Sequence, residues 1–320
     1  MRKQILEILR GYPHISGEEI SRRLHISRAA VAKHVKALRL EGYHINAVTG
    51  KGYEFICAPD KLLPAEIAGH LPLDTPWRLQ YIAETTSTNI LLREMAEAGA
   101  PEYTALIAES QNAGQGRLDR SWHSPPGEAM FLSVLLRPKI PPQVAQTMTL
   151  TAACAVQETL ADFDIYCFIK WPNDILSANG LKLCGIKTEM RADMDSVAWL
   201  ITGIGLNINN ALFPAELTET ATSLRLITGK SMDRTAVTAA VLRHLAENYQ
   251  LLVREGFAPI RDKWKHHASM LGKEVTVDNN GIKISGIALD LNEMGHLLIE
   301  QKDGQVITVT TGDVNIGIRD

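Results

Sequence analysis

Residues 16–41 read SGEEISRRLHISRAAVAKHVKALRLE, and the elements that this stretch predicts decide the fold of the first part of the chain. Ser16 followed by Glu19 has the pattern of a capping box, in which a hydroxyl and a carboxylate satisfy free amides at the start of a helix. We therefore expect a short helix over residues 17–24, followed at once by a tight turn at His25.

Ser27 has the same capping role for a longer helix over residues 28–41. One face of this helix is apolar and the opposite face is basic. This is the pattern of a helix that packs on a core with one side and presents positive charge with the other. The apolar face carries Val31, Val35 and Leu38, and the basic face carries Arg28, Lys33, Lys36 and Arg39.

The flanking segments complete the first domain, residues 1–60, which we call the head. Residues 2–10 have helical spacing, and residues 43–47 and 53–56 are two short strands around a glycine-containing loop. Helix, helix, turn, helix, hairpin is the order of a winged helix-turn-helix, which we predict for residues 1–60. This head holds ten Lys/Arg against six Asp/Glu, whereas the rest holds 23 against 30. The basic excess suggests nucleic acid as a partner, although such a face is often only solvated.

The remainder of the chain is interpreted as two more domains, after a proline-containing linker at residues 59–64. In residues 65–268 strands follow loops as often as helices, so we expect an α+β domain with a mixed sheet and not a doubly wound one. One long helix is expected over residues 143–163. Residues 270–320 predict one short strand after another, with a strong turn signal at residues 278–281, which fits a small β-barrel.

Several features limit the classes of protein to which this chain can belong. No apolar run is long enough to span a membrane, and charges stand at the start where a signal peptide needs its apolar stretch, so we expect a cytoplasmic protein with no membrane partner. The four cysteines form no C-x-x-C pair, and we interpret them as structural thiols rather than as disulfides or a zinc site. They are Cys57, Cys154, Cys167 and Cys184.

A glycine loop with the sequence SQNAGQGRLDRSW lies at residues 110–122, between two predicted strands. Its glycines let backbone amides approach an anion closely, and Arg117 and Arg120 add guanidinium groups suited to phosphate or carboxylate. Trp122 is placed to close an apolar wall. Because no helix follows, the loop is neither a Rossmann turn nor a P-loop. The alternative is a flexible loop with solvated arginines.

Two lysine-containing stretches follow. In KWPND, residues 170–174, a lysine before Asn-Asp is suited to a polyphosphate and its magnesium ion, although a turn with a solvated lysine explains it as well. In LKLCGI, residues 181–186, Lys182 stands alone in an apolar stretch. Most such lysines point to water, and one that turns inward needs an anionic partner.

Two small polar stretches complete the set. Residues 203–207, GIGLN, place small residues at a strand end, where they permit close approach of a ligand, and Asn207 is suited to a purine edge. The alternative is a bulged strand. Residues 87–89, STN, have the simplest role of capping the next helix, although a helix N-terminus also offers amides and a hydroxyl to a polar ligand.

Each signal is weak alone, but in this order and spacing they resemble those of the biotin–protein ligases. The matching stretches are residues 87–89, 111–122, 170–174, 182–186 and 203–207. With a winged helix-turn-helix in front and a small β domain behind, the chain is similar over its whole length to the bifunctional type, the biotin operon repressor. The resemblance implies an α+β fold with a central catalytic domain of the biotin/lipoate-ligase, class II synthetase-like type and a C-terminal SH3-like barrel.

The resemblance also implies a reaction. Members of this family activate biotin with ATP to biotinyl-5′-AMP and pass biotin to a lysine of the biotin carrier domain of a carboxylase, such as acetyl-CoA carboxylase. The chain would thus be an ATP- and Mg²⁺-dependent ligase and a biotin-responsive repressor of biotin genes. Biotinyl-5′-AMP would be both the intermediate and the corepressor, since it favours the homodimer that binds operator DNA.

The resemblance also implies a role for individual residues of this chain. The implied biotin-binding residues are Ser87, Thr88, Asn89, Gln111, Gly114, Gln115, Gly116, Arg117 and Lys182. The implied ATP- and adenylate-binding residues are Arg117, Arg120, Trp122, Lys170, Asn173, Asp174 and Asn207. Lys182, Arg117 and Lys170 would carry catalysis, because positive charge stabilises the phosphate oxygens when the carboxylate attacks. Asp174 would hold Mg²⁺ through ATP.

For the head, the resemblance implies that the helix-turn-helix at residues 17–36 binds DNA, with the second helix of the motif in the major groove. The residues expected at this interface are Ser27, Arg28, Lys33, His34 and Lys36.

One residue departs from the family pattern. The family usually has Arg or Lys between the two loop glycines, and this chain has Gln115. We expect ligase activity to survive and retention of the adenylate to be weaker. Three alternatives remain: a biotin-sensing repressor with little ligase activity, a lipoate-ligase-type enzyme, and a ligase whose head no longer regulates.

Overall fold

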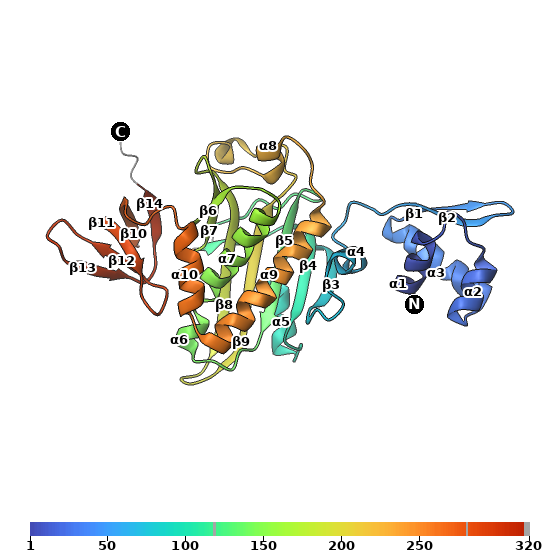
Figure 1. Cartoon of the computed structure of the whole chain (residues 1–320), viewed down its shortest axis with the longest axis horizontal. Coiled ribbons are helices and arrows are strands. Elements are labelled where there is room, and N and C mark those ends of the chain that lie inside the picture. The colour runs from blue at the N-terminus through green and yellow to red at the C-terminus, as the bar shows by residue number, and fades with distance from the viewer. Residues whose placement is uncertain (118–119, 280, 317–320) are drawn as a thin grey trace. The chain divides into compact units, whose positions relative to one another are not determined.

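The computed structural model describes residues 1–117, 120–279 and 281–316. It divides into two compact units, Met1–Lys61 and Leu62–Asp320 (Figure 1). Both contain helices and strands, as the predicted α+β class requires. No helix among the described residues has the length and apolar character needed to cross a membrane.

The first unit has the predicted order of a winged helix-turn-helix. Its elements are α1 (Arg2–Arg10), α2 (Gly17–Leu24), α3 (Arg28–Glu41) and the antiparallel hairpin of β1 (His44–Val48) and β2 (Gly52–Cys57). Apolar side chains from all three helices and from β1 form its core, which includes Ile5, Leu9, Ile20, Val31, Val35, Leu38 and Ile45.

The start of α2 differs from the predicted capping box. The Ser16 hydroxyl accepts a hydrogen bond from the Glu19 amide at 3.0 Å, as expected. The Glu19 carboxylate, however, pairs with Arg22 and Arg23, at 2.5 and 2.7 Å. Both arginines lie one turn further along the helix, where a charged donor binds a carboxylate more strongly than a neutral amide does. Only the serine half of the motif is therefore formed.

The second unit is built on a seven-stranded mixed sheet in the order β3-β4-β5-β9-β8-β7-β6. The β3–β4 pair is parallel and the other pairs are antiparallel. The strands are β3 (Arg78–Thr85), β4 (Thr104–Gln111), β5 (Ala129–Leu136), β6 (Cys167–Lys170), β7 (Asp174–Ser177), β8 (Lys182–Ala192) and β9 (Val197–Asn207). The helices are α4 (Pro64–His70), α5 (Thr88–Glu97), α6 (Pro142–Ala145), α7 (Met148–Asp162), α8 (Leu224–Thr228), α9 (Arg234–Glu255) and α10 (Ala258–His267).

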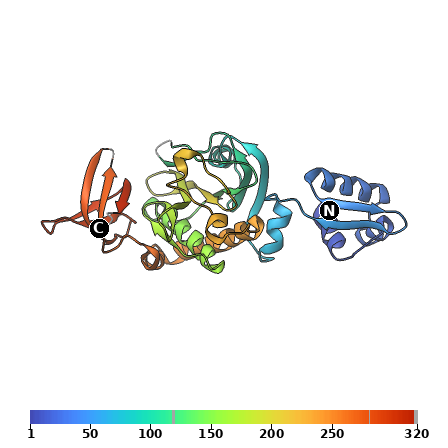
Figure 2. The ribbon, with the colours of Figure 1, turned by 90° about the horizontal axis from the view of Figure 1, so that it is seen from above.

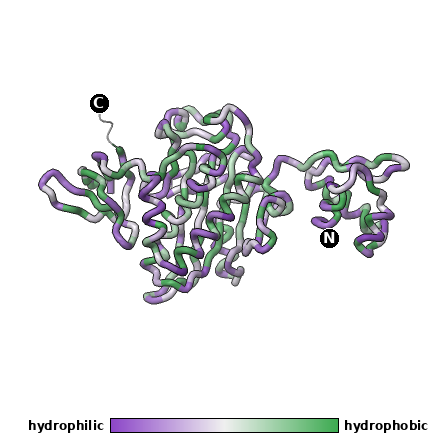
Figure 3. Tube along the Cα trace, in the orientation of Figure 1, coloured by the Kyte–Doolittle hydropathy of each residue, from purple (hydrophilic) through white to green (hydrophobic). Residues whose placement is uncertain are grey.

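Helices cover the two faces of this sheet unequally. The green α7 and the orange α9 lie together on one face, as the two perpendicular views show (Figures 1 and 2). On β5, Met130 and Leu132 point into the core beneath these helices, whereas Phe131 and Leu135 belong to small clusters on the other face. Strands buried on both faces are apolar along their length, and the hydropathy colouring shows this for the centre of the sheet (Figure 3).

The prediction of a single helix over residues 143–163 is wrong, because α6 ends at Ala145 and α7 begins at Met148. Thr147 lies at the break with ψ near 0°, and its hydroxyl donates to the Val144 carbonyl at 2.7 Å. A threonine that bonds to a nearby carbonyl competes with the regular helical hydrogen bonds, which explains the interruption.

The last part of the second unit is a five-stranded antiparallel sheet in the order β13-β12-β11-β10-β14. Its strands are β10 (Glu274–Asn279), β11 (Ile282–Leu291), β12 (Leu297–Glu300), β13 (Val306–Val309) and β14 (Asp313–Ile316). The run of short strands predicted for residues 270–320 is therefore confirmed. The turn signal at residues 278–281 is confirmed by a hydrogen bond from the Gly281 amide to Asp278, at 2.8 Å, while Asn280 lies outside the described residues.

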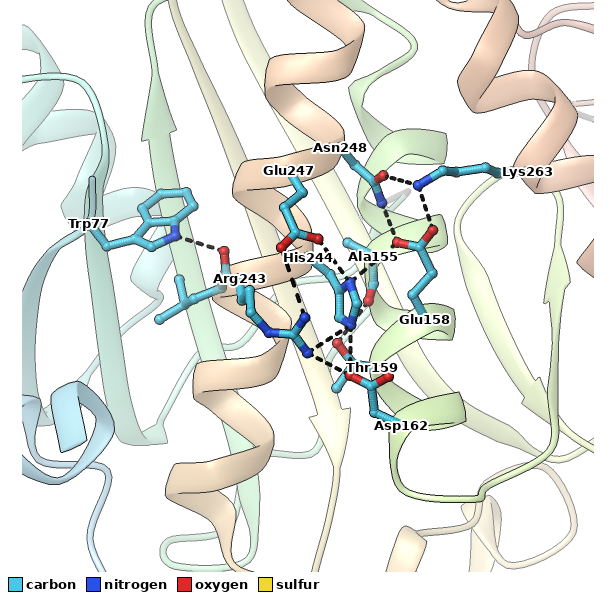
Figure 4. Close-up of polar contacts among 11 residues, drawn as sticks. Trp77, Ala155, Glu158, Thr159, Asp162, Arg243, His244, Glu247, Asn248 and Lys263 are labelled. Carbon is cyan, nitrogen blue, oxygen red and sulfur yellow. Dashed lines mark hydrogen bonds and ion pairs between the residues drawn. The ribbon is translucent and has the colours of Figure 1, made fainter. Parts of the chain in front are cut away.

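A polar network joins α7, α9 and α10 on the helical side of the sheet (Figure 4). The His244 ring lies 2.8 Å from the Asp162 carboxylate and 3.6 Å from that of Glu158. Asn248, which is 1% exposed, donates to Glu158 at 2.7 Å, and the Lys263 ammonium lies 2.7 Å from both residues. The members of this network satisfy one another.

Candidate active site

A cavity of about 360 Å³ lies over β8 and β9, on the side of the sheet opposite to α7 and α9. Gly203, Gly205 and Asn207 of β9 line it, while the alternate residues Ile204 and Leu206 belong to the core beneath the helices, and Ile204 also reaches the cavity. The alternation of side chains along a strand therefore places this group of polar and small residues on one surface.

Most residues singled out from the sequence meet at this cavity. Those that line it are Ser87, Thr88, Asn89, Gln111, Gln115, Gly116, Arg117, Arg120, Trp122, Asn173, Asp174, Lys182 and Asn207. Two residues of the set, Lys170 and Gly114, are not among the described lining residues. Leu118 and Asp119 of the glycine loop lie outside the described residues.

The positions of the two exceptions have structural reasons. Lys170 is the last residue of β6 and pairs with Asp174 across the β6–β7 hairpin, so it adjoins the site through the backbone. Gly114 packs closely inside the loop, where an added Cβ would lie 2.8 Å from the Ser124 hydroxyl oxygen. Their roles toward a ligand stay predictions.

One end of the cavity is formed mainly by uncharged polar side chains. Lys187, which pairs with Glu189 at 3.5 Å, also lines the cavity, and the Asn89 amide donates to Glu189 at 3.1 Å. The Gln111 carbonyl oxygen accepts hydrogen bonds from the Thr88 amide at 2.8 Å and from the Thr88 hydroxyl at 3.1 Å. The Ser133 hydroxyl lies 2.7 Å from both Thr88 Oγ1 and Asn89 Oδ1. Ser87 occupies the N-cap position of α5 without a capping hydrogen bond from its side chain. The simple capping role is therefore wrong for Ser87, because Gln111 binds the amide at this helix start instead.

Glycines allow two side chains to lie flat on the sheet. An added Cβ on Gly203 would lie 2.2 Å from Asn89 Oδ1, and Cβ atoms on Gly185 and Gly205 would lie 2.7 and 2.6 Å from the Trp122 indole. Gly203 and Gly205 pair regularly with β5 and lie within β9, so the alternative of a bulged strand is wrong. These glycines are needed for the close approach of Asn89 and Trp122, whereas the close approach of a ligand stays a prediction.

The other end of the cavity is charged. The Lys182 ammonium lies 2.7 Å from Asp174 Oδ1 and 5.4 Å from the centre of the Trp122 ring. Lys182 therefore turns inward to an anionic partner, and the default interpretation of a solvent-facing lysine is wrong. Arg117 donates to Asn173 Oδ1 at 3.0 Å and to Thr311 Oγ1 at 2.8 Å, and Arg120 forms an ion pair with Asp313.

The electrostatics of this end favour an anion. Burial lowers the pKa of Arg117, while the carboxylates of Asp313 and Asp174 raise it. The guanidinium nevertheless stays protonated at neutral pH, because arginine is effectively always charged in proteins. Each cation thus has an oxygen partner that an anionic ligand can replace.

Asp174 offers a carboxylate oxygen to a hard cation, and it lies in the same cavity as Arg117 and Lys182. The described residues contain no group of three or more His, Cys, Asp or Glu side chains that would form a metal cage. A single carboxylate of this kind fits a Mg²⁺ ion that takes its other oxygens from phosphates and water.

Three buried cysteines lie close to the sheet and behave as core residues. Burial raises the pKa of the Cys167 thiol to about 12 and also raises the pKa of Cys154 and Cys184. Such thiols stay protonated at neutral pH and make poor nucleophiles and poor metal ligands.

Sequence reasoning missed three polar residues of the site. Ser133 is a lone hydroxyl in the apolar strand AMFLSVLL, and this mismatch was the only signal that pointed to it. Thr311 and Asp313 follow the glycine loop by more than 190 residues, and no local pattern links them to it.

In the first unit, the predicted DNA-binding residues lie on one helix-turn-helix. Ser27 caps α3 by accepting from the Ala30 amide at 3.1 Å, and Arg28, Lys33 and Lys36 are exposed, while His34 is half-buried. Arg39, which the sequence placed on the same basic face, instead donates to the Ile45 carbonyl at 2.7 Å.

Three family models match the chain. Residues 80–207 match the Biotin/lipoate A/B protein ligase family, residues 1–54 match an HTH domain, and residues 270–317 match the Biotin protein ligase C terminal domain.

Relatives and solved structures agree with these matches. The chain is 39% identical to the bifunctional ligase/repressor BirA of Bacillus spizizenii, over 99% of each chain. It is 30% identical to the bifunctional ligase/repressor BirA of Escherichia coli, over 94% of this chain and 92% of the relative. The structure is similar to a biotin protein ligase from Aquifex aeolicus in complex with biotin and ATP, with a TM-score of 0.65 and 32% identity over 75% of this chain and 98% of the other.

Proposed function

This chain belongs to the family of the bifunctional ligase/repressor BirA proteins, and from that premise we propose that it forms biotinyl-5′-AMP from biotin and ATP and transfers biotin to a carrier lysine. The observation that carries the proposal is that one end of the cavity is formed mainly by uncharged polar side chains, whereas the other end contains Arg117, Arg120 and Lys182. Biotin has a neutral ureido head and a carboxylate tail, and the second substrate is a polyphosphate. A cavity of this kind complements both ligands.

The end formed mainly by uncharged polar side chains is proposed to bind the biotin head. Gln111, Thr88, Asn89 and Ser133 already form one hydrogen-bonded group there, so their donors and acceptors are oriented before the ligand arrives. Such pre-organisation lowers the entropy that is lost on binding.

The cationic end is proposed to carry the first chemical step. Lys182 would leave Asp174 to pair with the biotin carboxylate and orient it toward the α-phosphate. Arg117 and Arg120 would stabilise the charge that develops on the phosphate oxygens as the new bond forms and pyrophosphate leaves. Mg²⁺, held through Asp174 and the phosphates of ATP, would neutralise part of the same charge.

Asn207 is proposed to contact the adenine. Its side-chain amide nitrogen donates to the Thr222 carbonyl at 3.0 Å, so its carbonyl oxygen is the group that would accept a hydrogen bond from the adenine amino group. Lys170, at the end of β6, is proposed to act at the phosphates from outside the described lining of the cavity.

The ligase proposal is tested by incubating the protein with biotin, Mg²⁺-ATP and a biotin carrier domain, and by measuring carrier mass. A gain of one biotin is expected on the carrier, and none on a carrier whose acceptor lysine is replaced by arginine. Formation of biotinyl-5′-AMP without transfer would point to an unsuitable carrier or a faulty second step. The absence of both products would refute the ligase and favour the biotin-sensing repressor, and activation of lipoate instead of biotin would favour the lipoate-ligase alternative.

We also propose that the first unit binds operator DNA and represses biotin genes, from the cytoplasm, as a homodimer that biotinyl-5′-AMP favours. The exposed basic residues of α3, Arg28, Lys33 and Lys36, are proposed to contact bases and phosphates. DNA carrying the promoter of a biotin gene should bind more tightly when biotin and ATP are both present. Binding that is independent of both ligands would support the alternative of a head that no longer regulates.

A further inference from the structure

Side chains from the C-terminal sheet contact the glycine loop, and no role follows for them from the reaction itself. Thr311 lies in the connection between β13 and β14, and Asp313 is the first residue of β14. The Thr311 hydroxyl oxygen accepts from Arg117 at 2.8 Å, and the Asp313 carboxylate pairs with Arg120. Asp313 also lines the cavity.

The loop is fastened differently at its start and at its tip. At the start, backbone amides of Asn112 and Ala113 donate to the carbonyls of Thr85 and Thr86, both at 3.0 Å. At the tip, by which we mean Gly116, Arg117 and Arg120, the Gly116 amide donates to the Arg120 carbonyl at 2.7 Å. Within the part of the chain that the structure describes, the backbone hydrogen bonds of Gly116, Arg117 and Arg120 stay within the loop, so contacts of their side chains are needed to hold them over the cavity.

Among the described residues, the polar contacts from the tip arginines to the rest of the unit reach Asn173, Thr311 and Asp313. Two of these three partners belong to the C-terminal sheet. Packing of Trp122 on Gly185 and Gly205 holds the end of the loop nearest β5. The C-terminal sheet therefore provides most of the polar attachment of the tip.

We propose that Thr311 and Asp313 are positioning residues that tether the tip of the glycine loop over the cavity and thereby slow the release of the acyl-adenylate. The tether itself rests only on the contacts above, and its effect on the adenylate rests on the proposed ligase function. The tether is compatible with ligand binding, since a guanidinium has five N–H donors and Arg117 can keep Thr311 while it binds phosphate.

The tether is measured first without any ligand. Trypsin cleaves after arginine, so the rate of cleavage after Arg117 and Arg120 in the full chain reports how often the tip leaves its partners. We expect Thr311→Val and Asp313→Asn each to accelerate this cleavage about threefold and the double variant about tenfold, since exposed ion pairs and single hydrogen bonds have modest strength.

Two controls make the result specific. Thr311→Ser keeps the hydroxyl and should restore slow cleavage. Glu300→Gln makes the same change of charge at the exposed last residue of β12, a strand that is separated from β14 by β10 and β11, and should leave cleavage unchanged. Thermal unfolding of each variant shows whether faster cleavage merely follows lower stability.

The second measurement is the dissociation rate of biotinyl-5′-AMP formed from biotin and Mg²⁺-ATP. We expect the variants to rank in the same order by dissociation rate as they do by rate of trypsin cleavage. Unchanged cleavage in the double variant would overturn the tether, and an unchanged or slower dissociation would overturn its role in retention. If the wild-type protein forms no adenylate, the ligase proposal fails, and the trypsin assay still decides whether the tether exists.

Discussion

The two sides of the central sheet contain similar charged groups in different surroundings. On the helical side, Lys263 lies 2.7 Å from Glu158, within a network in which each polar group has a partner (Figure 4). On the cavity side, Lys182 lies 2.7 Å from Asp174, in a site with about 360 Å³ of space. The two ion pairs have the same chemistry and the same length.

The difference lies in what can replace the partner. Lys263 joins the helices but does not line the cavity, so its ion pair can only stabilise those helices, whereas a lysine beside a cavity can exchange its carboxylate for that of a ligand. Pairing distance alone therefore does not separate a structural ion pair from a functional one, and the space beside the pair does. Four predictions test this contrast.

The largest effect is expected from Lys182→Met, which removes the charge and keeps most of the volume. Formation of biotinyl-5′-AMP should fall about 100- to 1000-fold, because a pre-oriented charged donor is lost from the transition state. Lys263→Met is the matched control on the helical side and should leave the rate unchanged. Equal losses of activity in the two variants would break the contrast.

A large effect on stability is expected from Asn248→Ala. Asn248 is 1% exposed and bridges Glu158 and Lys263, so its replacement removes two hydrogen bonds to charged groups and leaves a small gap, although Glu158 and Lys263 still pair with each other. The free energy of unfolding should fall by about 1–3 kcal/mol, with no change in the adenylation rate of the folded protein. Denaturant unfolding measures the first quantity, and a loss of rate at full folding would contradict the prediction.

A smaller effect is expected from Gln115→Arg, which restores the usual positive charge between the loop glycines. The dissociation rate of biotinyl-5′-AMP should fall about threefold, because an added cation at the rim of the cavity attracts the phosphate through solvent. Gln115→Met, which is similar in size and uncharged, serves as the control. An identical dissociation rate in wild type and Gln115→Arg would refute the idea that Gln115 weakens retention.

The smallest effect concerns the loss of stability at low pH. The hydrogen bond to His244 is the main cause that lowers the pKa of Asp162. A carboxyl whose pKa is lower in the folded state stabilises the protein above its unfolded-state pKa of about 3.9, and this stability is lost as the pH falls through the folded-state pKa.

In His244→Gln, the decline of unfolding free energy below about pH 4 should therefore be shallower than in the wild type. The change should amount to a few tenths of a kcal/mol, since the Asp162 side chain is 45% exposed and solvent screens the pair. Denaturant unfolding at pH 5 and at about pH 3 measures the slope, and equal slopes would show that the pair contributes nothing.

Local patterns predicted the parts of the fold that local interactions determine. The helix over residues 28–41 has a serine cap, an apolar line and a glycine after it, and all three signals agree. Local patterns did not predict the helical break at Thr147 or the pairing of Glu19 with two arginines. In each case, one side chain has several possible hydrogen-bond partners nearby. Sequence shows that such partners exist but not which one is bound.

The candidate site follows the same division. The motif residues that line the cavity lie in short stretches with recognisable composition, so sequence could find them. Ser133, Thr311 and Asp313 act through contacts between distant segments, and their residue types are common everywhere on protein surfaces and in strands. Only the folded chain brings them together.

The tether between the glycine loop and the C-terminal sheet also has a consequence for synthesis. Arg117 and Thr311 are 194 residues apart, so the ribosome must add β14 long after the loop and after the whole helix-turn-helix has emerged. Since domains fold from the N-terminus during translation, the head can be complete while the cavity still lacks its outer rim. Translation that stops before β13 would therefore release a chain with the helix-turn-helix intact and the loop unfastened.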